Sequence, residues 1–341
     1  MSKKILITGG PGFIGHQVVK RLLLDTDYEI LIMDRLSYAG NLNRLNEIII
    51  ESGEENRSRI SFMYYDLKAS FNKDVIKRIE DINIILHIAA SSHVTNSVET
   101  PSIFIQDNIV GTFNLLEAAR KVKDLELFYY FSTDEVFGPS DDDSKFNEWD
   151  RFNSRNPYSA SKASGEELTI AYSNTYSVPS LITHCCNVYG QRQHSEKFIP
   201  NTIKKIMANQ EIVIHTDANN LPGSRYYLYN EDLAKSIVFL VKNQEEARLQ
   251  SVNFYKKDPA KINISGDSLI TNLEVVEFIG ELMEKKPNFK FENKDITRPG
   301  HDVKYGLNNN LIKTIGGHFD RDFKDGIDDV VTWYKNNPHW V

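Results

Sequence analysis

Four side chains near the middle of the chain could combine acid–base chemistry with redox chemistry. Asp134 and Glu135 follow shortly after the apolar run 127–131, while Tyr158 and Lys162 stand four positions apart. Residues at that spacing share one face of a helix, where a lysine ammonium could favour the phenolate of the tyrosine. A phenolate can accept the proton of a hydroxyl group while a hydride leaves the same carbon. Together, the four side chains indicate an oxidation that is coupled to an elimination.

The two adjacent carboxyl groups would have different roles in such a reaction. Oxidation of a sugar hydroxyl makes the neighbouring C–H group acidic, because the resulting carbanion is an enolate. We expect Glu135 to remove that proton and Asp134 to act as the acid that helps a β-hydroxyl leave as water. Burial and a like-charged neighbour would raise the pKa of Asp134 and keep it protonated. An isolated acidic pair is more often a solvated turn, but the carboxyl end of a parallel strand is a ligand-binding position.

A glycine-rich turn near the amino terminus could hold a dinucleotide. Residues 9–15 read Gly-Gly-Pro-Gly-Phe-Ile-Gly and lie between an apolar run and a helical pattern. Glycines in such a turn let the backbone approach a pyrophosphate, which the helix N-terminus attracts. Asp34, nineteen positions after Gly15, could bind ribose hydroxyls and repel a 2′-phosphate, so NAD is favoured over NADP, although Arg35 could favour NADP. We expect cofactor contacts at Gly9, Gly12, Gly15, Asp34, Arg35, Asp66, Leu67, Ala89, Ala90, Tyr158 and Lys162.

Length, composition and charge limit the class of protein. With 341 residues, 40% of them hydrophobic and 26% charged, the chain can form one large domain or two moderate ones. A net charge of −7 gives no basic footprint for nucleic acid, and no stretch approaches the ~18 apolar residues of a membrane span. Cys185 and Cys186 are adjacent and cannot form a disulfide framework, so a reducing compartment fits. We therefore expect a cytoplasmic protein with a small anionic substrate, and no metal site, nucleic-acid partner or membrane contact.

Apolar runs alternate with helical patterns in the first half of the chain. The runs are residues 4–8, 29–33, 60–65, 83–88, 127–131 and 179–184, and the helical patterns lie at 13–24, 72–79, 101–122 and 158–176. Runs that are apolar throughout are typical of parallel strands covered by helices on both faces. In the second half, helices are predicted at 196–207, 231–241, 273–284 and 327–335, and short strands at 211–214 and from 261 onward.

These patterns predict an α/β fold with two interleaved units. A Rossmann-type doubly wound parallel sheet would comprise residues 1–186 plus about 229–256 and would bind NAD. A smaller α+β substrate lobe would comprise residues 187–228 plus about 257–341. Ligands of open parallel sheets bind outside the carboxyl ends of the strands, so the residues after the apolar runs should face one site.

The chain resembles the extended short-chain dehydrogenases and, within them, the nucleotide-sugar 4,6-dehydratases. The resemblance covers essentially the whole chain and rests on the motifs at residues 8–15, 34–41, 108–112, 132–138, 157–164, 196–200 and 298–302. Epimerases and decarboxylases of this family share the cofactor motif and the pair Tyr158 and Lys162, but they usually lack an aspartate before the glutamate. The motif Thr133-Asp134-Glu135 therefore favours a dehydratase.

Several properties are implied by this resemblance. It implies a tightly held NAD, a glucose linked to dTDP or UDP as substrate, a 4-keto-6-deoxy product of the kind used for rhamnose, and a homodimer formed by helices 101–122 and 158–176. It adds Thr133 to the catalytic residues. It also adds Phe13, Ile14, Ser37, Gly40 and Asn108 to the cofactor contacts. The substrate contacts that it implies are Ser92, His93, Thr133, Asn187, Lys197, His215, Arg225, Arg298 and His301.

Departures from the family pattern keep other activities open. Residues 91–96 read Ser-Ser-His-Val-Thr-Asn where close relatives carry Glu-Ser-His-Val-Asp-Arg, so two acids and an arginine are lost near the expected sugar site. Further departures are Val188, Gln191, His215, Tyr226 and Tyr227. They leave the nucleotide and the rate undetermined. The alternatives are a nucleotide-sugar 4-epimerase or decarboxylase of the same architecture, or a catalytically idle NAD-binding regulator; the complete catalytic set argues against the last.

Overall fold

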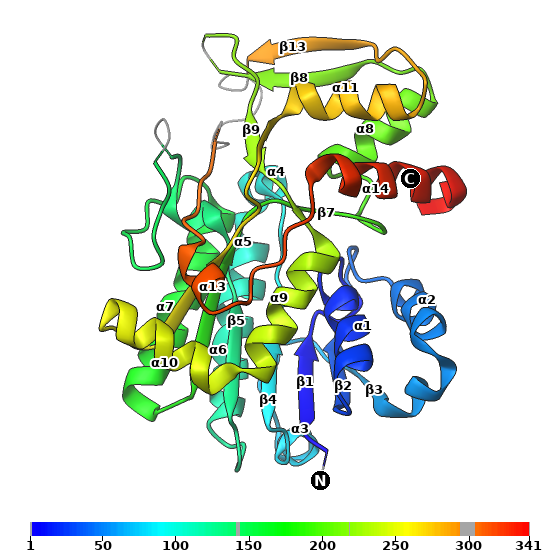
Figure 1. Ribbon diagram of the computed structural model, residues 1–341. Helices are drawn as coiled ribbons and strands as arrows, with labels where there is room; N and C mark the ends of the chain where they lie inside the picture. Colours follow the sequence, from blue (N-terminus) through cyan, green and yellow to red (C-terminus); the bar gives the residue numbers. More distant parts are fainter. Residues whose placement is uncertain (1, 141–143, 218, 294–303, 341) are drawn as a thin grey trace.

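A seven-stranded parallel sheet forms the centre of the larger unit (Figure 1). The computed structural model describes residues 2–140, 144–217, 219–293 and 304–340. The strand order is β11-β6-β5-β4-β1-β2-β3, and every neighbouring pair is parallel. This is a doubly wound sheet, as the sequence predicts. Its strands are β1 (Lys4–Thr8), β2 (Glu29–Asp34), β3 (Ile60–Tyr64), β4 (Ile84–His87), β5 (Leu127–Phe131), β6 (Ser180–Cys185) and β11 (Ala260–Ile264).

Helices cover both faces of this sheet. Successive side chains of a strand point to opposite faces, so Ile5 and Ile7 of β1 pack in one core cluster and Leu6 packs in another. The first cluster includes α1 (Gly15–Asp25), α2 (Leu42–Ser52) and α9 (Asn230–Lys242), and the second includes α3 (Lys73–Ile79), α6 (Gly111–Ala119) and α7 (Pro157–Tyr176). The remaining elements of this unit are η1 (Glu54–Arg59), α4 (Val94–Glu99), α5 (Pro101–Phe104), η2 (Ile105–Val110), η3 (Asp134–Phe137) and α10 (Gln244–Tyr255).

The smaller lobe lies beyond the carboxyl ends of the sheet strands (Figure 1). It contains the pairs β8 (Ile212–Thr216) with β13 (Phe289–Asn293), β9 (Ser224–Tyr226) with β12 (Leu269–Thr271), and β7 (Val188–Tyr189) with β10 (Leu228–Tyr229). A separate core joins these strands to the helices of the lobe. Those helices include α8 (Phe198–Met207), α11 (Asn272–Leu282) and α14 (Phe323–Asn336); α13 (Asn310–Thr314) and η4 (Pro338–Trp340) complete the described elements.

Several elements differ from the sequence predictions, and the helices α2 (Leu42–Ser52) and α4 (Val94–Glu99) were not predicted. The helix predicted over 101–122 is three segments, because a π-helical stretch, η2, separates α5 from α6, and α6 ends at Ala119. A π-turn admits an extra residue into the helix, a feature that occurs often at functional sites. In addition, α10 was not predicted. It packs against β11 and carries alternating charged and apolar residues with little helical periodicity.

The edge strand β11 also corrects one boundary between the two units. We expected residues from 257 onward to belong to the smaller lobe, yet β11 pairs with β6 from Ala260 to Ile264 and is buried along its whole length. Pairing satisfies the backbone groups of β6 that would otherwise be left open at the sheet edge. Within the described ranges, each helix is too short or too polar to cross a bilayer.

Candidate active site

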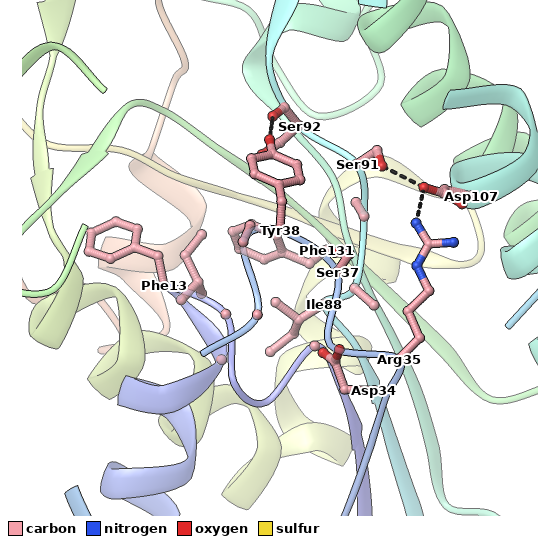
Figure 2. Close-up of a pocket in the computed structure, with 18 of the residues that line it drawn as sticks. Phe13, Asp34, Arg35, Ser37, Tyr38, Ile88, Ser91, Ser92, Asp107 and Phe131 are labelled. Carbon is pink, nitrogen blue, oxygen red and sulfur yellow. Dashed lines mark hydrogen bonds and ion pairs between the residues drawn. The ribbon is translucent and has the colours of Figure 1, made fainter. Parts of the chain in front are cut away.

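A cavity of about 240 Å³ runs along the carboxyl ends of β1, β2, β4 and β5. Figure 2 shows side chains from several loops converging on it. Most of the predicted cofactor contacts line this cavity, so residues from all parts of the first half of the chain meet there. They are Gly9, Gly12, Phe13, Ile14, Gly15, Asp34, Arg35, Ser37, Gly40, Asp66, Leu67, Ala89, Ala90, Tyr158 and Lys162.

The glycine-rich turn has the close packing that a dinucleotide cradle requires. Gly9 has a φ of +79°, and a Cβ atom there would lie 2.8 Å from the backbone of Ala89. A Cβ atom on Gly15 would lie 2.0 Å from the carbonyl oxygen of Gly9, and the amide of Gly12 donates to that same oxygen at 3.0 Å. Side chains are thus excluded from the surface that leads into α1. The turn and the helix N-terminus fit a pyrophosphate.

Asp34 and Arg35 distinguish between the two forms of the dinucleotide. Asp34 ends β2, and its Oδ1 accepts a hydrogen bond from the amide of Leu36 at 2.6 Å. Arg35 is engaged by two carboxylates, Asp66 at 3.2 Å and Asp107 at 2.6 Å, as Figure 2 shows for Asp107. Its charge is therefore already balanced. A 2′-phosphate would meet the carboxylate of Asp34 and an occupied arginine, so the cavity favours NAD.

Asn108 lies behind the cavity rather than along it. Its Oδ1 accepts from the amide of Ser91 at 2.8 Å, and its Nδ2 donates to the carbonyl of Ser91 and to the hydroxyl of Ser161, both at 2.9 Å. The neighbouring Asp107 accepts a hydrogen bond from the hydroxyl of Ser91 at 2.6 Å. The π-helical turn thus directs two consecutive side chains toward the loop after β4. Asn108 thus positions the loop after β4, and its contact with the cofactor stays a prediction.

A second cavity lies between the sheet and the smaller lobe. It shares Ser92, Tyr158, Glu196 and Lys197 with the first, so the two cavities meet at Tyr158. Predicted substrate contacts that line it are Ser92, His93, Asn187, Lys197, His215 and Arg225. Thr133 does not line it but lies beside Asp134. The predicted contacts Arg298 and His301 lie outside the described residues.

Further residues that line the second cavity were not predicted. Asn201 and Lys205 follow Lys197 at intervals of four along α8, so all three share one face of that helix. This spacing is visible in the sequence and could have revealed them. Asn272 and Tyr305 come from distant segments, and Tyr305 lies with its ring centre 4.9 Å from the guanidinium carbon of Arg225.

Asp134 and Glu135 begin a short helical turn, η3, directly after β5. Asp134 is 4% exposed, and its Oδ1 accepts a hydrogen bond from the hydroxyl of Thr133 at 3.1 Å. Burial, followed by the charge of Glu135, raises the pKa of Asp134 to about 7. Glu135 lines the second cavity, and its Oε2 accepts a hydrogen bond from the side-chain amide of Asn156 at 3.3 Å. The pair thus combines an acid whose pKa lies near neutrality with a second carboxyl group that faces the cavity.

Tyr158 and Lys162 lie on the first turns of α7. Asn156 caps this helix in a capping box with Ser159, which fixes where α7 begins. Burial, then the charge of Glu135, raises the pKa of Tyr158, while a hydrogen bond with Thr133 opposes the rise. Burial lowers the pKa of Lys162 to about 7, against the charge of Glu166.

A cluster of charges lies beneath these residues in the interior. Glu166, one turn beyond Lys162 on α7, pairs with Lys261 of β11 at 2.7 Å and with His184 of β6 at 3.0 Å. The Nδ1 of His184 faces the Oδ1 of Asn263 at 2.9 Å, because the Nδ2 of Asn263 donates to two carbonyls. Both ring nitrogens of His184 therefore face oxygen atoms, one of Asn263 and one of Glu166. The strands β6 and β11 therefore hold α7 in place by polar contacts with Glu166 as well as by packing.

The sequence resembles known proteins over nearly its whole length. Residues 6–318 match the family described as GDP-mannose 4,6 dehydratase. The chain is 35% identical to a dTDP-glucose 4,6-dehydratase of Escherichia coli, in an alignment that covers 99% of this chain and 95% of the relative.

Solved structures show a similar fold. The dTDP-glucose 4,6-dehydratase DesIV of Streptomyces venezuelae, crystallised with NAD, has a TM-score of 0.83 and 27% identity, with 99% of this chain and 98% of that chain covered. The dTDP-glucose 4,6-dehydratase of Bacillus anthracis, in complex with NAD, has a TM-score of 0.82 and 28% identity, with the same coverage of 99% and 98%.

Proposed function

Because the chain belongs to the nucleotide-sugar 4,6-dehydratases of the extended short-chain dehydrogenase family, we propose that it removes water from a glucose linked to dTDP or UDP, giving the 4-keto-6-deoxy sugar nucleotide. One observation carries this proposal. Glu135 and Tyr158 line the second cavity where it meets the first, and the buried acid Asp134 lies directly before Glu135 in the chain. This arrangement provides oxidation and elimination at a single sugar ring.

The first cavity would hold NAD through the glycine-rich turn, Asp34 and the loops after β3 and β4. When bound, NAD supplies the oxidant for C4 and later the reductant for C6. Tyr158 would remove the proton of the C4 hydroxyl. Lys162, one turn along α7, would favour the phenolate of Tyr158 when its own amine, whose pKa burial lowers to about 7, is protonated.

The elimination would divide between the two acidic residues. Glu135 would remove the proton from C5, since its carboxylate faces the sugar cavity. Asp134 would donate a proton to the C6 hydroxyl as it leaves as water. A pKa of about 7 leaves a large share of Asp134 protonated at neutral pH, so the acid is available without a further change. Thr133 would contact the sugar and the acid together.

The diphosphate and the base would lie in the second cavity. Lys197, Lys205 and Arg225 line it and can bind phosphate oxygens. The resemblance adds Arg298 and His301, and also Ser92, His93, Asn187 and His215 as contacts of the sugar nucleotide. The proposed NAD unit comprises residues 1–186 and about 229–264, and the proposed substrate lobe comprises the rest.

We also infer a cytoplasmic homodimer whose product serves the formation of a rhamnose-type sugar. Apolar side chains remain exposed on the segments that would pair: Ile103 at 47%, Ile105 and Phe113 at 43%, and Tyr176 at 47%. Such a surface is typical of an association site. Two adjacent cysteines, both buried and neither in a disulfide, suit a reducing compartment.

Mass spectrometry of the products from dTDP-glucose and UDP-glucose, measured side by side, tests the proposal. We expect one of the two to lose the mass of one water and to turn over faster. Tyr158→Phe should abolish the loss, because the hydroxyl proton would have no acceptor. A product of unchanged mass from both substrates would contradict the dehydratase activity and favour an epimerase.

A further inference from the structure

Two buried arginines connect the cofactor cavity to the smaller lobe. Arg44 lies on α2, and Arg192 lies in the segment between β7 and α8; each is 2% exposed. Burying a guanidinium is costly unless carbonyl or carboxylate oxygens satisfy its donors. Their partners therefore indicate what the two side chains hold in place.

Arg44 donates hydrogen bonds to three segments around the cavity. Its Nη1 donates to the carbonyls of Pro11 at 3.1 Å and Ala39 at 2.6 Å, and its Nε donates to the carbonyl of Arg192 at 3.0 Å. Pro11 belongs to the glycine-rich turn and Ala39 to the loop after β2. The side chain of Arg44 itself lines the first cavity. One guanidinium thus ties two cofactor loops to a segment of the lobe.

Arg192 attaches the same lobe segment to α2. Its Nε donates to Glu47 at 2.5 Å and its Nη2 to Glu51, while its guanidinium lies 5.0 Å from the ring centre of Trp333. The indole of Trp340 donates to Glu47 at 3.2 Å. Figure 1 shows α14 and the carboxyl-terminal end on the same side of the molecule as α2. We refer to the set Arg44, Glu47, Glu51, Arg192, Trp333 and Trp340 as the arginine clasp.

The segment that follows Arg192 covers the cofactor cavity. Gln193, His194, Glu196 and Lys197 all line it. The loop after β2 reaches the same place. The hydroxyl of Tyr38 lies 3.4 Å from the carbonyl of Ser92 (Figure 2), and it lies 3.4 Å from a carboxylate oxygen of Glu196. The clasp therefore fixes the backbone of both segments at the mouth of the cavity.

We propose that the arginine clasp holds residues 193–197 and the loop after β2 closed over the cofactor, and so slows the release of NAD. Arg44 and Arg192 are then positioning residues, since they act through the backbone that they hold. The inference rests on the proposed function only in taking NAD as the occupant of the first cavity. Retention matters for this chemistry because the hydride that NAD would accept from C4 has to return to the same sugar at C6.

Exchange of bound, isotopically labelled NAD for unlabelled NAD tests the clasp without any turnover. Arg44→Met removes three hydrogen bonds of a charged donor and should speed the exchange by about tenfold or more. Arg44→Lys keeps the charge and part of the donor set, and should restore a slower exchange. Arg192→Met should act in the same direction as Arg44→Met.

Arg59→Met is the matched control. Arg59 also donates to backbone carbonyls, those of Leu23, Thr26 and Tyr28, but at the amino end of β3, away from the cavity. It should lower the thermal unfolding temperature while leaving NAD exchange unchanged. If the buried-arginine variants fail to fold, Trp340→Ala removes a half-buried member of the clasp, whose ring centre lies 5.4 Å from the guanidinium carbon of Arg44, and should still speed the exchange.

Native exchange rates in both Arg44→Met and Trp340→Ala would overturn the inference, as would an equal acceleration in Arg59→Met. These outcomes are independent of the reaction. A protein that loses no water from either sugar nucleotide would contradict the proposed function but would leave the exchange results, and the clasp, as they are.

Discussion

Asp134 and Glu166 are two buried carboxyl groups that the fold holds in opposite states. Asp134, at the carboxyl end of β5, is 4% exposed, and Glu166, in the middle of α7, is 0% exposed. Burial and the charge of Glu135 raise the pKa of Asp134 to about 7. Burial also raises the pKa of Glu166, but His184 and Lys261 outweigh it and lower that pKa to about 2. Similar burial therefore accompanies a raised pKa at Asp134 and a lowered pKa at Glu166.

The difference lies in the charges that each group faces. Glu166 receives cations from two strands, β6 and β11, and is fixed as an anion in the interior. Asp134 faces another carboxylate, and Arg225 opposes its pKa rise less strongly than burial and Glu135 promote it. The structural charge of Glu166 is thus matched by partners, whereas Asp134, the proposed proton donor, lies beside another acidic residue.

The largest expected effect is the loss of activity when Asp134, the unmatched carboxyl group, is replaced. Asp134→Asn keeps the shape of the side chain but removes the acid, so kcat for water loss should fall by about 10²–10⁴-fold. NAD binding should not change, because Asp134 does not line the first cavity. Steady-state rates with the preferred sugar nucleotide, together with NAD content, measure both. Turnover at the native rate would show that Asp134 is not the acid.

Substitution of Glu166, whose charge is matched by His184 and Lys261, should lower the stability of the fold. Glu166→Gln leaves His184 and Lys261 without their anion, and should lower the free energy of unfolding by about 3–5 kcal/mol. Urea denaturation measures the change. Glu167→Gln, the same substitution at an exposed position of the same helix, should have little effect. Equal losses in the two variants would mean that the buried cluster contributes nothing specific.

The pH dependence of stability should have opposite signs at the two sites. The folded pKa of Asp134 is raised, so its contribution is full below the unfolded value of 3.8 and is lost as the pH rises through about 7. The folded pKa of Glu166 is lowered, so its contribution is present above 4.5 and is lost as the pH falls through about 2. Between these pKa values one proton changes stability by about 1.4 kcal/mol per pH unit.

Urea midpoints between about pH 5 and pH 8 test this sign. Relative to the native protein, Asp134→Asn should become more stable as the pH rises over this range. The carboxyl group of Glu166 is ionised throughout this range and should add no slope of its own to the stability of the native protein. A flat difference between Asp134→Asn and the native protein would show that the pKa of Asp134 is not raised.

The sequence predicted one side of this comparison better than the other. The catalytic side follows from local spacing: Asp134 and Glu135 are adjacent, Tyr158 and Lys162 are one turn apart, and strand ends converge in any doubly wound sheet. The rise in the pKa of Asp134 follows from burial beside Glu135, and both were predictable.

The supporting charges depend on partners far away in the chain. Glu166 and Lys261 come together only because β11 returns to the sheet, and we had placed that segment in the smaller lobe. Arg44 meets the carbonyl of Arg192 across 148 positions. The π-turn that places Asn108 behind the cofactor loop has no spacing signal either. Contacts between residues far apart in the chain produce no periodic pattern in the sequence. They could therefore be identified only in the structure.

The smallest expected effect concerns the hydrogen bond that moderates the acid. The hydroxyl of Thr133 donates to Asp134 and lowers its pKa, so Thr133→Val should raise that pKa by less than about one unit. The high-pH limb of the kcat profile, which reports loss of the acid's proton, should move upward by the same amount. Thr133→Ser keeps the hydroxyl and should restore the native limb. Ser132→Ala removes a neighbouring buried hydroxyl that has no hydrogen-bond partner among the described residues, and it should not move the limb. A limb that stays in place in Thr133→Val would mean that burial and Glu135 alone set the pKa of Asp134, and the comparison with Glu166 would then rest on charge and burial without hydrogen bonding.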